Sequence, residues 1–425
     1  MRRFVLLFVM VLTMWLLISC DDTNLDKENV VQISTSETLN VLKVENIPND
    51  FIMGMDVSSV LSLESSGVKF YDYDGMECDV FKTLASSGIN YIRVRVWNNP
   101  FTKDYKGYGG GNCDINNLIA IGKRANKYGM KLLVDFHYSD FWADPSKQMV
   151  PKAWLELNIE DKCAALYSFT KDSLVKLKEN NIDVGIVQVG NETNGMMCGE
   201  SSWSNITKLM RSGIKACREI LPSTMVALHF TNPEIDGLYD QYAFNLKSAN
   251  IDYDIFASSY YPFWHGSLEN LANVLNNVSN KYNKKVMIVE TSYPYTSSDT
   301  DFFANTISSS SNVNKNYPYT ILGQATAIRD LINCVVNDMQ NGIGVCYWEG
   351  AWISVGTNSY DENYKKWETY GSGWASSYAM EYDPSDAGKW YGGCSVDNQA
   401  LFNEYGKPLE SLKIFNLVKN GNIIK

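Results

Sequence analysis

The sequence predicts one (β/α)8 TIM barrel, an α/β fold in which eight parallel strands close into a cylinder and a helix follows each strand. Two observations favour this fold. Eight short apolar segments recur between residues 51 and 349, and segments with helical periodicity separate them, which is the order typical of parallel α/β folds. The chain has 425 residues and is 45% hydrophobic, and α/β barrels often use this much chain as one domain.

The expected strands are short runs rich in β-branched and aromatic residues, which favour extended chain. In order, they are 51–58, 91–97, 131–139, 184–192, 225–230, 254–261, 285–292 and 342–349. The expected helices are 75–87, 115–129, 159–180, 204–220, 236–248, 267–283, 322–341 and 409–418. In the seventh of these, Ile328, Leu331, Ile332 and Val335 have the spacing of one buried helical face, and Gly342 ends the helix.

A doubly wound open sheet is the alternative architecture. It would need a glycine-rich turn directly after a strand to hold a dinucleotide. The only such run, "GYGGGNC" at 107–113, follows Pro100 and a loop. The barrel, with long loops after its strands, is therefore the preferred prediction.

The N-terminal segment is predicted to be an export signal. Arg2 and Arg3 precede an uncharged apolar run at 4–19 that is short for a membrane span, and Cys20 follows Leu17-Ile18-Ser19. This pattern resembles a bacterial lipobox, whose cysteine is lipidated after cleavage; a plain secretory signal is the alternative. We expect a signal peptide at 1–19, a lipidated Cys20 with a polar tether to residue 46, and a catalytic barrel at 47–425.

These segments predict an exported protein that is anchored by lipid at the cell envelope, at the outer membrane or the cell surface. The lipid would be its one contact with a membrane. The formal net charge of −11 argues against a nucleic-acid partner, because such partners require a basic surface. We expect a monomer.

The cysteines leave disulfide bonding open. Eight cysteines follow Cys20, and an even number in an exported chain permits disulfides. Cys163, Cys217 and Cys334, however, lie in expected helices, and Cys346 lies in an expected strand, where free cysteine is a common apolar filler. There is no CxxC pair in the sequence, so a zinc cluster has no support.

Polar residues gather where the expected strands end, which is where barrels place active-site groups. The chain has three histidines: His137 and His229 end strands, and His265 follows one. Arg93 and Arg95 share one face of the second strand. They must point into the barrel mouth or be paired by acids.

Tryptophan is concentrated in the same places. Apart from Trp15, all tryptophans lie at strand ends or in segments that follow strands, and Trp348 directly follows the eighth apolar run. Indole rings over an active face suit a ligand with apolar faces and polar edges, such as a pyranose ring. Small apolar clusters within long loops are the alternative explanation.

Two glutamates are the best candidates for catalysis. Glu192 ends the fourth expected strand, in "VQVGNETNG", and Glu290 ends the seventh, in "KKVMIVETSYP". Two carboxyl groups ~5–5.5 Å apart perform retaining glycoside hydrolysis. Asn191 offers an amide for a sugar 2-hydroxyl, and an arginine such as Arg95 could hold Glu290 ionised. A structural salt-bridge role for both glutamates is the alternative.

The sequence also resembles glycoside hydrolase family 53, the endo-β-1,4-galactanases, from about Met53 to Leu412. The resemblance rests on "GMDVSSV", "GVKFYDYDG", "YIRVRVWNNP", "LLVDFHYSDFWADP", "VQVGNETNGM", "YYPFWHGSLENL", "VMIVETSYPYT" and "GIGVCYWEGAW". It implies that Glu192 is the acid/base and Glu290 the nucleophile. The positions that it implies around the central sugar subsite are Asp56, Arg95, His137, Asn191, Tyr261, His265 and Trp348.

The resemblance further implies internal cleavage of β-1,4-galactan, a side chain of pectin, with retention of configuration and no required cofactor. Some relatives bind calcium in the loop after the seventh strand. Here that loop contains Asp299, Asp301 and Asn305, which are the candidate ligands of a structural calcium ion. The competing functions are hydrolysis of another β-linked hexan such as mannan, and glycan binding by a non-catalytic barrel.

Overall fold

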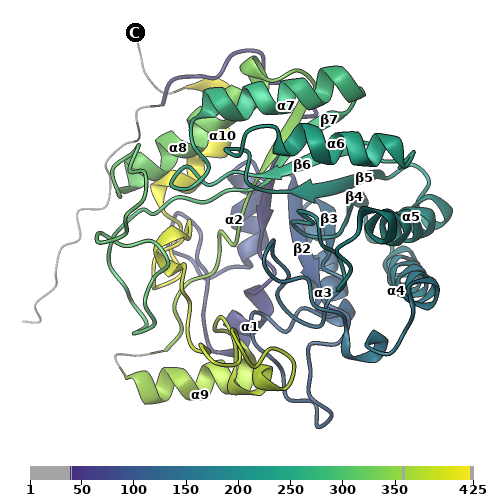
Figure 1. Ribbon diagram of the computed structural model, residues 1–425. Coiled ribbons are helices and arrows are strands. Elements are labelled where there is room, and N and C mark those ends of the chain that lie inside the picture. The colour runs from purple at the N-terminus through teal and green to yellow at the C-terminus, as the bar shows by residue number, and fades with distance from the viewer. Residues whose placement is uncertain (1–38, 40, 357–358, 422–425) are drawn as a thin grey trace, which may run out of the picture. The chain divides into compact units, whose positions relative to one another are not determined.

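The computed structural model describes residues 39, 41–356 and 359–421, so the predicted signal peptide, Cys20 and most of the predicted tether lie outside the described residues. The described strands form one closed parallel barrel in chain order (Figure 1). They are β1 Ile52–Asp56, β2 Tyr91–Val96, β3 Lys131–Phe136, β4 Val184–Val189, β5 Met225–Phe230, β6 Ile255–Ser259, β7 Lys285–Glu290 and β8 Gly342–Tyr347.

Helices cover the outside of the barrel (Figure 1). They are α1 Val60–Ser65, α2 Val80–Ser86, α3 Ile115–Lys127, α4 Ile159–Glu179, α5 Trp203–Ile220, α6 Leu238–Ser248, α7 Leu268–Tyr282, α8 Ile321–Asn333, α9 Tyr360–Tyr370 and α10 Ile414–Asn420. A π-helical turn at Cys334–Asp338 extends α8, and 3-10 turns lie at Lys152–Trp154, Ser377–Glu381, Asp397–Gln399 and Glu410–Lys413. No helix among the described residues is long and apolar enough to span a membrane.

The predicted barrel is confirmed, and its eight strands lie where the sequence places them. Seven of the expected strands run past the observed end, because the chain leaves the barrel at the residues that carry polar groups. Two elements were missed: α1, which is six residues long, and α9, which lies in the loop after β8. The helix expected at 322–341 ends as an α-helix at Asn333 and continues as the π-helical turn.

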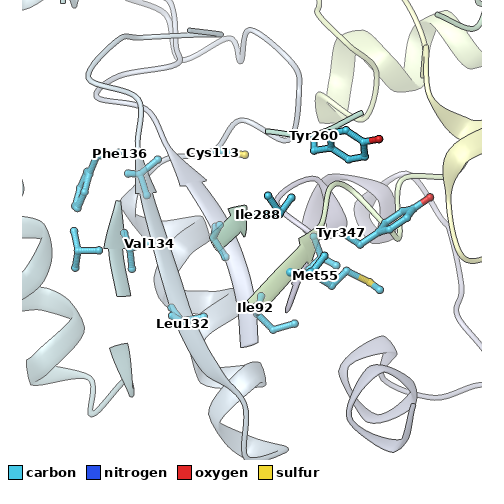
Figure 2. Close-up of a cluster of buried hydrophobic side chains, with 14 of the residues drawn as sticks. Met55, Ile92, Cys113, Leu132, Val134, Phe136, Tyr260, Ile288 and Tyr347 are labelled. Atoms are coloured by element: carbon cyan, nitrogen blue, oxygen red, sulfur yellow. The ribbon is translucent and has the colours of Figure 1, made fainter. Parts of the chain in front are cut away.

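The two faces of β2 contact two different apolar clusters, one between the barrel and its helices and one inside the barrel. Ile92, Val94 and Val96 pack outward against the helices, in the same cluster as Leu132 and Val134 (Figure 2). The inner face of the barrel instead holds a smaller apolar layer, made of Ile52, Leu133, Ile186, Ala227, Ile255, Ala257, Met287, Val289 and Cys346. Arg93 and Arg95 point inward above this layer, so the expected division between the two faces of β2 is confirmed.

Non-glycine residues with positive φ follow four strands, namely β3 at Tyr138, β4 at Glu192, β5 at Asn232 and β8 at Glu349, and two of these residues are glutamates. Glu192 follows β4 with φ of 46°, and Glu349 follows β8 with the same value. A left-handed backbone is unfavourable for residues other than glycine and persists where the surroundings impose it. At both positions a carboxylate is turned toward the barrel axis and is buried or half-buried.

Disulfide bonds do not contribute to the described part of the chain. The eight cysteines there, Cys78 to Cys394, are all free. Six of them are buried and two are half-buried, as expected for cysteine that fills small apolar spaces. The open question about pairing is therefore answered in favour of free thiols for these residues.

Candidate active site

A cavity of about 640 Å³ opens at the carboxyl ends of the strands, the position of active sites in this fold. Glu192 and Glu290 both line it, together with loop residues that follow β3, β5, β6, β7 and β8. Its wall includes Asp144, Thr231, Asn232, Tyr261, Phe263, Trp264, His265, Trp348, Trp374 and Trp390. The two predicted catalytic carboxyl groups thus share one cavity.

Glu290 is the last residue of β7 and is held at both oxygens. Arg93 Nη2 donates to Oε1 at 2.7 Å, and the Tyr261 hydroxyl donates to Oε2 at 2.9 Å. Burial raises the pKa of Glu290 above its ordinary value, while the Arg93 guanidinium acts in the opposite direction. Contact with a cation and a hydroxyl donor favours the ionised form of this carboxylate.

Glu192 has a different environment. Its contact is a hydrogen bond of 2.6 Å from Ser259 Oγ to Oε1, with no cation within ion-pair distance among the described residues. Burial, and then the negative charge of Glu290, raises the pKa of Glu192 to about 8. The site therefore holds one carboxyl group that favours a proton and one that is supported as an anion, which is the division that acid–base catalysis requires.

Arg93 is the centre of the charged layer beneath the cavity. It donates to Asp56 at 3.0 Å, to Asp135 at 2.8 Å and to Asn191 Oδ1 at 3.0 Å, in addition to Glu290. The expectation that Arg95 holds Glu290 is wrong: the two arginines share a face, but Arg93 lies one pleat deeper in the barrel and reaches the carboxylate.

Arg95 lies in an aromatic environment instead. Its guanidinium pairs with Glu349, donates to Gly110 O at 2.5 Å, and lies 4.4 Å from the ring centre of Trp142. Trp142 stacks on Trp374 with ring centres 4.4 Å apart and an interplanar angle of 9°. Burial raises the pKa of Glu349 to about 7, against the influence of Arg95.

In His137 and His265, hydrogen bonds to Nδ1 show which ring nitrogen carries a hydrogen. His137 Nδ1 accepts hydrogen bonds from Trp97 Nε1 and the Ala143 amide, so Nε2 carries the hydrogen that faces Asp135 Oδ2 at 3.0 Å. His265 Nδ1 accepts from the Tyr261 amide at 3.1 Å, and burial lowers the pKa of His265 to about 4. His265 Nε2 is thus left as a donor on a residue that lines the cavity.

The residues implied for substrate binding divide into two groups. Tyr261, His265 and Trp348 line the cavity with the two glutamates. Asp56, Arg95, His137 and Asn191 lie behind this wall and are buried; Asn191 Nδ2 donates to Ala143 O at 3.0 Å. Sequence reasoning placed His229 and Glu349 at strand ends without giving them a role, and it missed Ser259 and the pairing of Arg93 with Glu290. The alternation of polar residues on β2 and β6 was the available signal.

Some of the tryptophans line the cavity, and others are buried behind its wall. Trp264, Trp348, Trp374 and Trp390 line the cavity, and Trp264 and Trp390 are 46% and 61% exposed. Trp97, Trp352 and Trp367 are fully buried, so for them the alternative explanation, an apolar cluster beneath the loops, is the correct one. Trp367 lies inside α9, a helix that the sequence pattern did not indicate.

A second group of carboxylates joins the loops after β7 and β8. Asp299, Asp301 and Asp397 each present an oxygen within 4.8 Å of the others. Asp301 accepts hydrogen bonds from the amides of Phe303 and Cys394, and burial raises the pKa of Asp301 to about 8. Asn305 Oδ1 and Asp397 Oδ1 are buried without a hydrogen-bond partner. Asp397 was missed because it is far away in the sequence.

A closed (β/α)8 barrel with two dissimilar glutamates, the half-buried Glu192 after β4 and the buried Glu290 at the end of β7, defines a glycosidase of the two-carboxylate type. The model of glycosyl hydrolase family 53 matches residues 52–415. The chain belongs to this family.

Individual relatives cover most of the chain. It is 54% identical to the endo-beta-1,4-galactanase of Bacillus subtilis over 402 residues, which is 94% of each chain. It is 36% identical to the arabinogalactan endo-beta-1,4-galactanase of Cellvibrio japonicus, over 73% of this chain and 82% of that one. The solved GH53 catalytic domain of Ignisphaera aggregans is 32% identical, with a TM-score of 0.78, and the match covers 89% of this chain and 99% of that one.

Proposed function

We propose that this glycosidase is an endo-β-1,4-galactanase that cleaves the backbone of galactan or arabinogalactan. The names of the relatives from Bacillus subtilis and Cellvibrio japonicus support this substrate. An open cavity with four tryptophans in its wall suits a neutral polysaccharide. The observation that carries the proposal is the pair of unequally supported carboxyl groups, Glu192 and Glu290, in this cavity.

The proposed reaction is a double displacement with retention of configuration. Glu290, as the anion, attacks the anomeric carbon and forms a glycosyl-enzyme ester, while Glu192 transfers its proton to the leaving oxygen. Glu192 then removes a proton from water, which attacks the anomeric carbon and releases Glu290. The Tyr261 hydroxyl and Arg93 balance the charge on Glu290 in both steps.

Substitution of the two glutamates tests the assignment. Glu290→Ala and Glu192→Gln are each expected to lower galactan hydrolysis by at least about 10³-fold, because each removes an essential group. Reducing ends released from linear galactan measure the effect, with mannan and xylan as competing substrates. Turnover by either variant at the wild-type rate, or faster release from mannan than from galactan, would contradict the proposal.

The pH profile tests the assigned roles. Activity requires Glu290 ionised and Glu192 protonated, so kcat/KM on galactan is expected to be bell-shaped. The alkaline limb should lie near the raised pKa of Glu192, about 8, and the acidic limb above the ordinary value of a carboxyl group. The anomer formed first, observed by NMR, distinguishes retention from inversion.

We also propose a structural calcium ion at Asp299, Asp301, Asp397 and Asn305. The donor set fits, because calcium prefers carboxylate and amide oxygens and two such atoms there are buried without a partner. Such an ion would tie the loop after β7 to residue 397, which lies in the loop after β8. It would take no part in the bond-breaking steps.

Thermal unfolding at two pH values tests this ion. In the metal-free protein the folded-state pKa of Asp301, about 8, exceeds the unfolded value of roughly 3.9. The folded state therefore binds more protons between these values, and its stability falls as pH rises. Calcium requires the ionised carboxylates, so the gain in Tm on adding calcium should be larger at pH 8 than at pH 5. Asp301→Asn should abolish the gain.

Finally, we propose that residues 1–19 direct export, that Cys20 carries a lipid which anchors the protein at the outer membrane or cell surface, and that the enzyme is a monomer. The apolar run after Arg2-Arg3 and the lipobox-like residues before Cys20 support the first two points. Detergent-phase partitioning of the native protein and of Cys20→Ala tests the anchor: the variant should move to the aqueous phase.

A further inference from the structure

A row of buried hydrogen bonds lies behind Glu192 and involves residues that the reaction above does not use. It runs from Gln188 on β4 through His229 on β5 and Ser259 on β6 to Glu192. The three residues behind Glu192 are fully buried. The row ends on Oε1 of Glu192 at 2.6 Å.

The contacts of Gln188 determine which atoms donate and which accept along this row of hydrogen bonds. Arg93 faces Gln188 Oε1 at 3.4 Å, which orients the amide so that Nε2 lies 2.6 Å from Asp135 Oδ1 and 3.0 Å from His229 Nδ1. The Glu192 amide also points at His229 Nδ1, at 3.4 Å. The second hydrogen of Gln188 Nε2 is shared among His229 Nδ1, Gly190 O at 3.1 Å and Asn191 Oδ1 at 3.2 Å. Together with the Glu192 amide it assigns His229 Nδ1 as an acceptor.

Asn191 Oδ1 also lies near His229 Nδ1, at 2.9 Å, but its two lone pairs face other donors, Arg93 Nη2 at 3.0 Å and Gln188 Nε2 at 3.2 Å. Burial and the charge of Arg93 lower the pKa of His229 well below its ordinary value, so the imidazole is neutral. The single ring hydrogen is therefore on Nε2, which faces Ser259 Oγ at 2.9 Å.

The hydroxyl hydrogen of Ser259 consequently has one acceptor in reach, Glu192. Its oxygen accepts from His229, so its own hydrogen is free to point at Glu192 Oε1. In a protonated carboxyl group the carbonyl oxygen is much the better acceptor, so the oxygen that faces this hydroxyl hydrogen is the one without the acid proton. The proton of Glu192 therefore resides on Oε2.

We propose that His229 and Ser259 are positioning residues for the acid/base, and that they direct the transferable proton of Glu192 to Oε2. The inference rests on the proposed role of Glu192. Neither residue touches the reacting atoms; both act through the carboxyl group. When Glu192 has given up its proton, the same hydroxyl stabilises the anion until the carboxylate takes a proton from water.

The other titratable or charged groups that act on Glu192 are Glu290, Asp144 and Arg93, and those that act on His229 are Arg93, Asp135 and His137. None of them is altered by removing the Ser259 hydroxyl. Ser259→Ala thus changes one interaction of Glu192 and leaves the charges around it in place.

The test begins with Ser259→Ala. Because a hydrogen bond to the ionised carboxylate is lost, the alkaline limb of kcat/KM on galactan should move upward by about one pH unit. The value of kcat should fall by roughly 10-fold, with KM changed less than 3-fold. Ser259→Thr retains a hydroxyl and should restore the limb.

Ser258→Ala is the matched control. Ser258 is the preceding residue of β6, and its hydroxyl bonds to Tyr239 on the other face of the strand. This variant should leave the alkaline limb unchanged. His229→Gln, which retains an N–H donor, should be less impaired than His229→Leu; if the histidine variants do not fold, the serine series still decides the matter.

Two further measurements separate an effect through Glu192 from general damage. An aryl β-galactobioside with a dinitrophenolate leaving group needs no proton, so the deficit of Ser259→Ala in kcat/KM should shrink several-fold on it. In the Glu192→Gln background, Ser259→Ala should have no additional effect. A normal alkaline limb in Ser259→Ala, or equal deficits on both substrates, would overturn the inference. Full activity of Glu192→Gln would instead overturn the proposed function.

Discussion

Arg93 and Arg95 are two residues apart on the same face of β2, and both are 1% exposed, yet their surroundings differ. Arg93 is within 3.0 Å of three carboxylates, Asp56, Asp135 and Glu290. Arg95 pairs closely with Glu349, lies 3.8 Å from Asp56 Oδ1, and has three indole rings within 6 Å of its guanidinium. Strand β2 thus supplies both Arg93, the cation that pairs with the catalytic Glu290, and Arg95, the cation that lies among the buried indole rings.

The difference shows how depth in a barrel determines the role of a residue. Two residues along a strand correspond to about 6.6 Å, so Arg95 lies nearer the mouth, where the long loops contribute Trp142 and Trp352. Arg93 lies where strands from around the barrel converge. We therefore expect the loss of Arg93 to affect both folding and chemistry, and the loss of Arg95 to affect mainly the buried indole rings that support the cavity residue Trp374.

The largest expected effect is that of Arg93→Met. It leaves three buried carboxylates without their cation, so the free energy of unfolding should fall by at least ~3–5 kcal/mol, measured by urea unfolding. Any folded fraction should lack detectable turnover, because Glu290 loses its ionic partner. The surface arginine Arg218 of the Arg218–Asp252 pair is the control, since Arg218→Met should cost less than about 1 kcal/mol. Equal losses in the two variants would remove the distinction.

A smaller effect is expected for Arg95→Met. Glu349 would lose its cation, but its pKa is already raised to about 7, and the group can take up a proton. The free energy of unfolding should fall by about 2–3 kcal/mol. KM for galactan should rise more than kcat falls, because Trp142 loses the cation against its face and Trp142 stacks on Trp374, which lines the cavity.

The double variant Arg95→Met/Glu349→Gln sharpens this comparison. Removing both charges should return the stability to within about 1 kcal/mol of wild type, as for other buried pairs replaced by neutral groups. No such compensation is expected for Arg93, because its charge is shared by several acids. If the double variant were as unstable as Arg95→Met alone, the pairing would not explain the effect of Arg95.

The smallest expected effect is the pH dependence that Glu349 contributes to stability. Its folded-state pKa, about 7, exceeds the unfolded value of roughly 4.3, so the folded state binds more protons between these two values. The contribution of Glu349 to the free energy of unfolding is present below pH 4 and is lost as pH rises to 7. Glu349→Gln should flatten that part of the Tm-against-pH curve. A slope identical to wild type would show that another group titrates there.

The sequence was sufficient for the strands and for both glutamates, because strand periodicity and strand ends are local features. It was not sufficient to distinguish Arg93 from Arg95, since alternation identifies a face and says nothing of depth. Asp397 joins Asp299 and Asp301 from about 100 residues away, without a local signal. Helix α1 was missed because it has only six residues, too few to show helical periodicity. Helix α9 was missed because it lies within a loop whose aromatic residues suggested ligand contacts.

The eight free cysteines have a practical consequence for anyone who handles this enzyme. Burial raises the pKa of Cys113, Cys217 and Cys346 to about 12, so these thiols remain protonated and react slowly with oxidants or with each other. Since no crosslink holds the described part of the chain together, reducing agents should not weaken it. The barrel can therefore be produced in a reducing cytosol, with no oxidative refolding step.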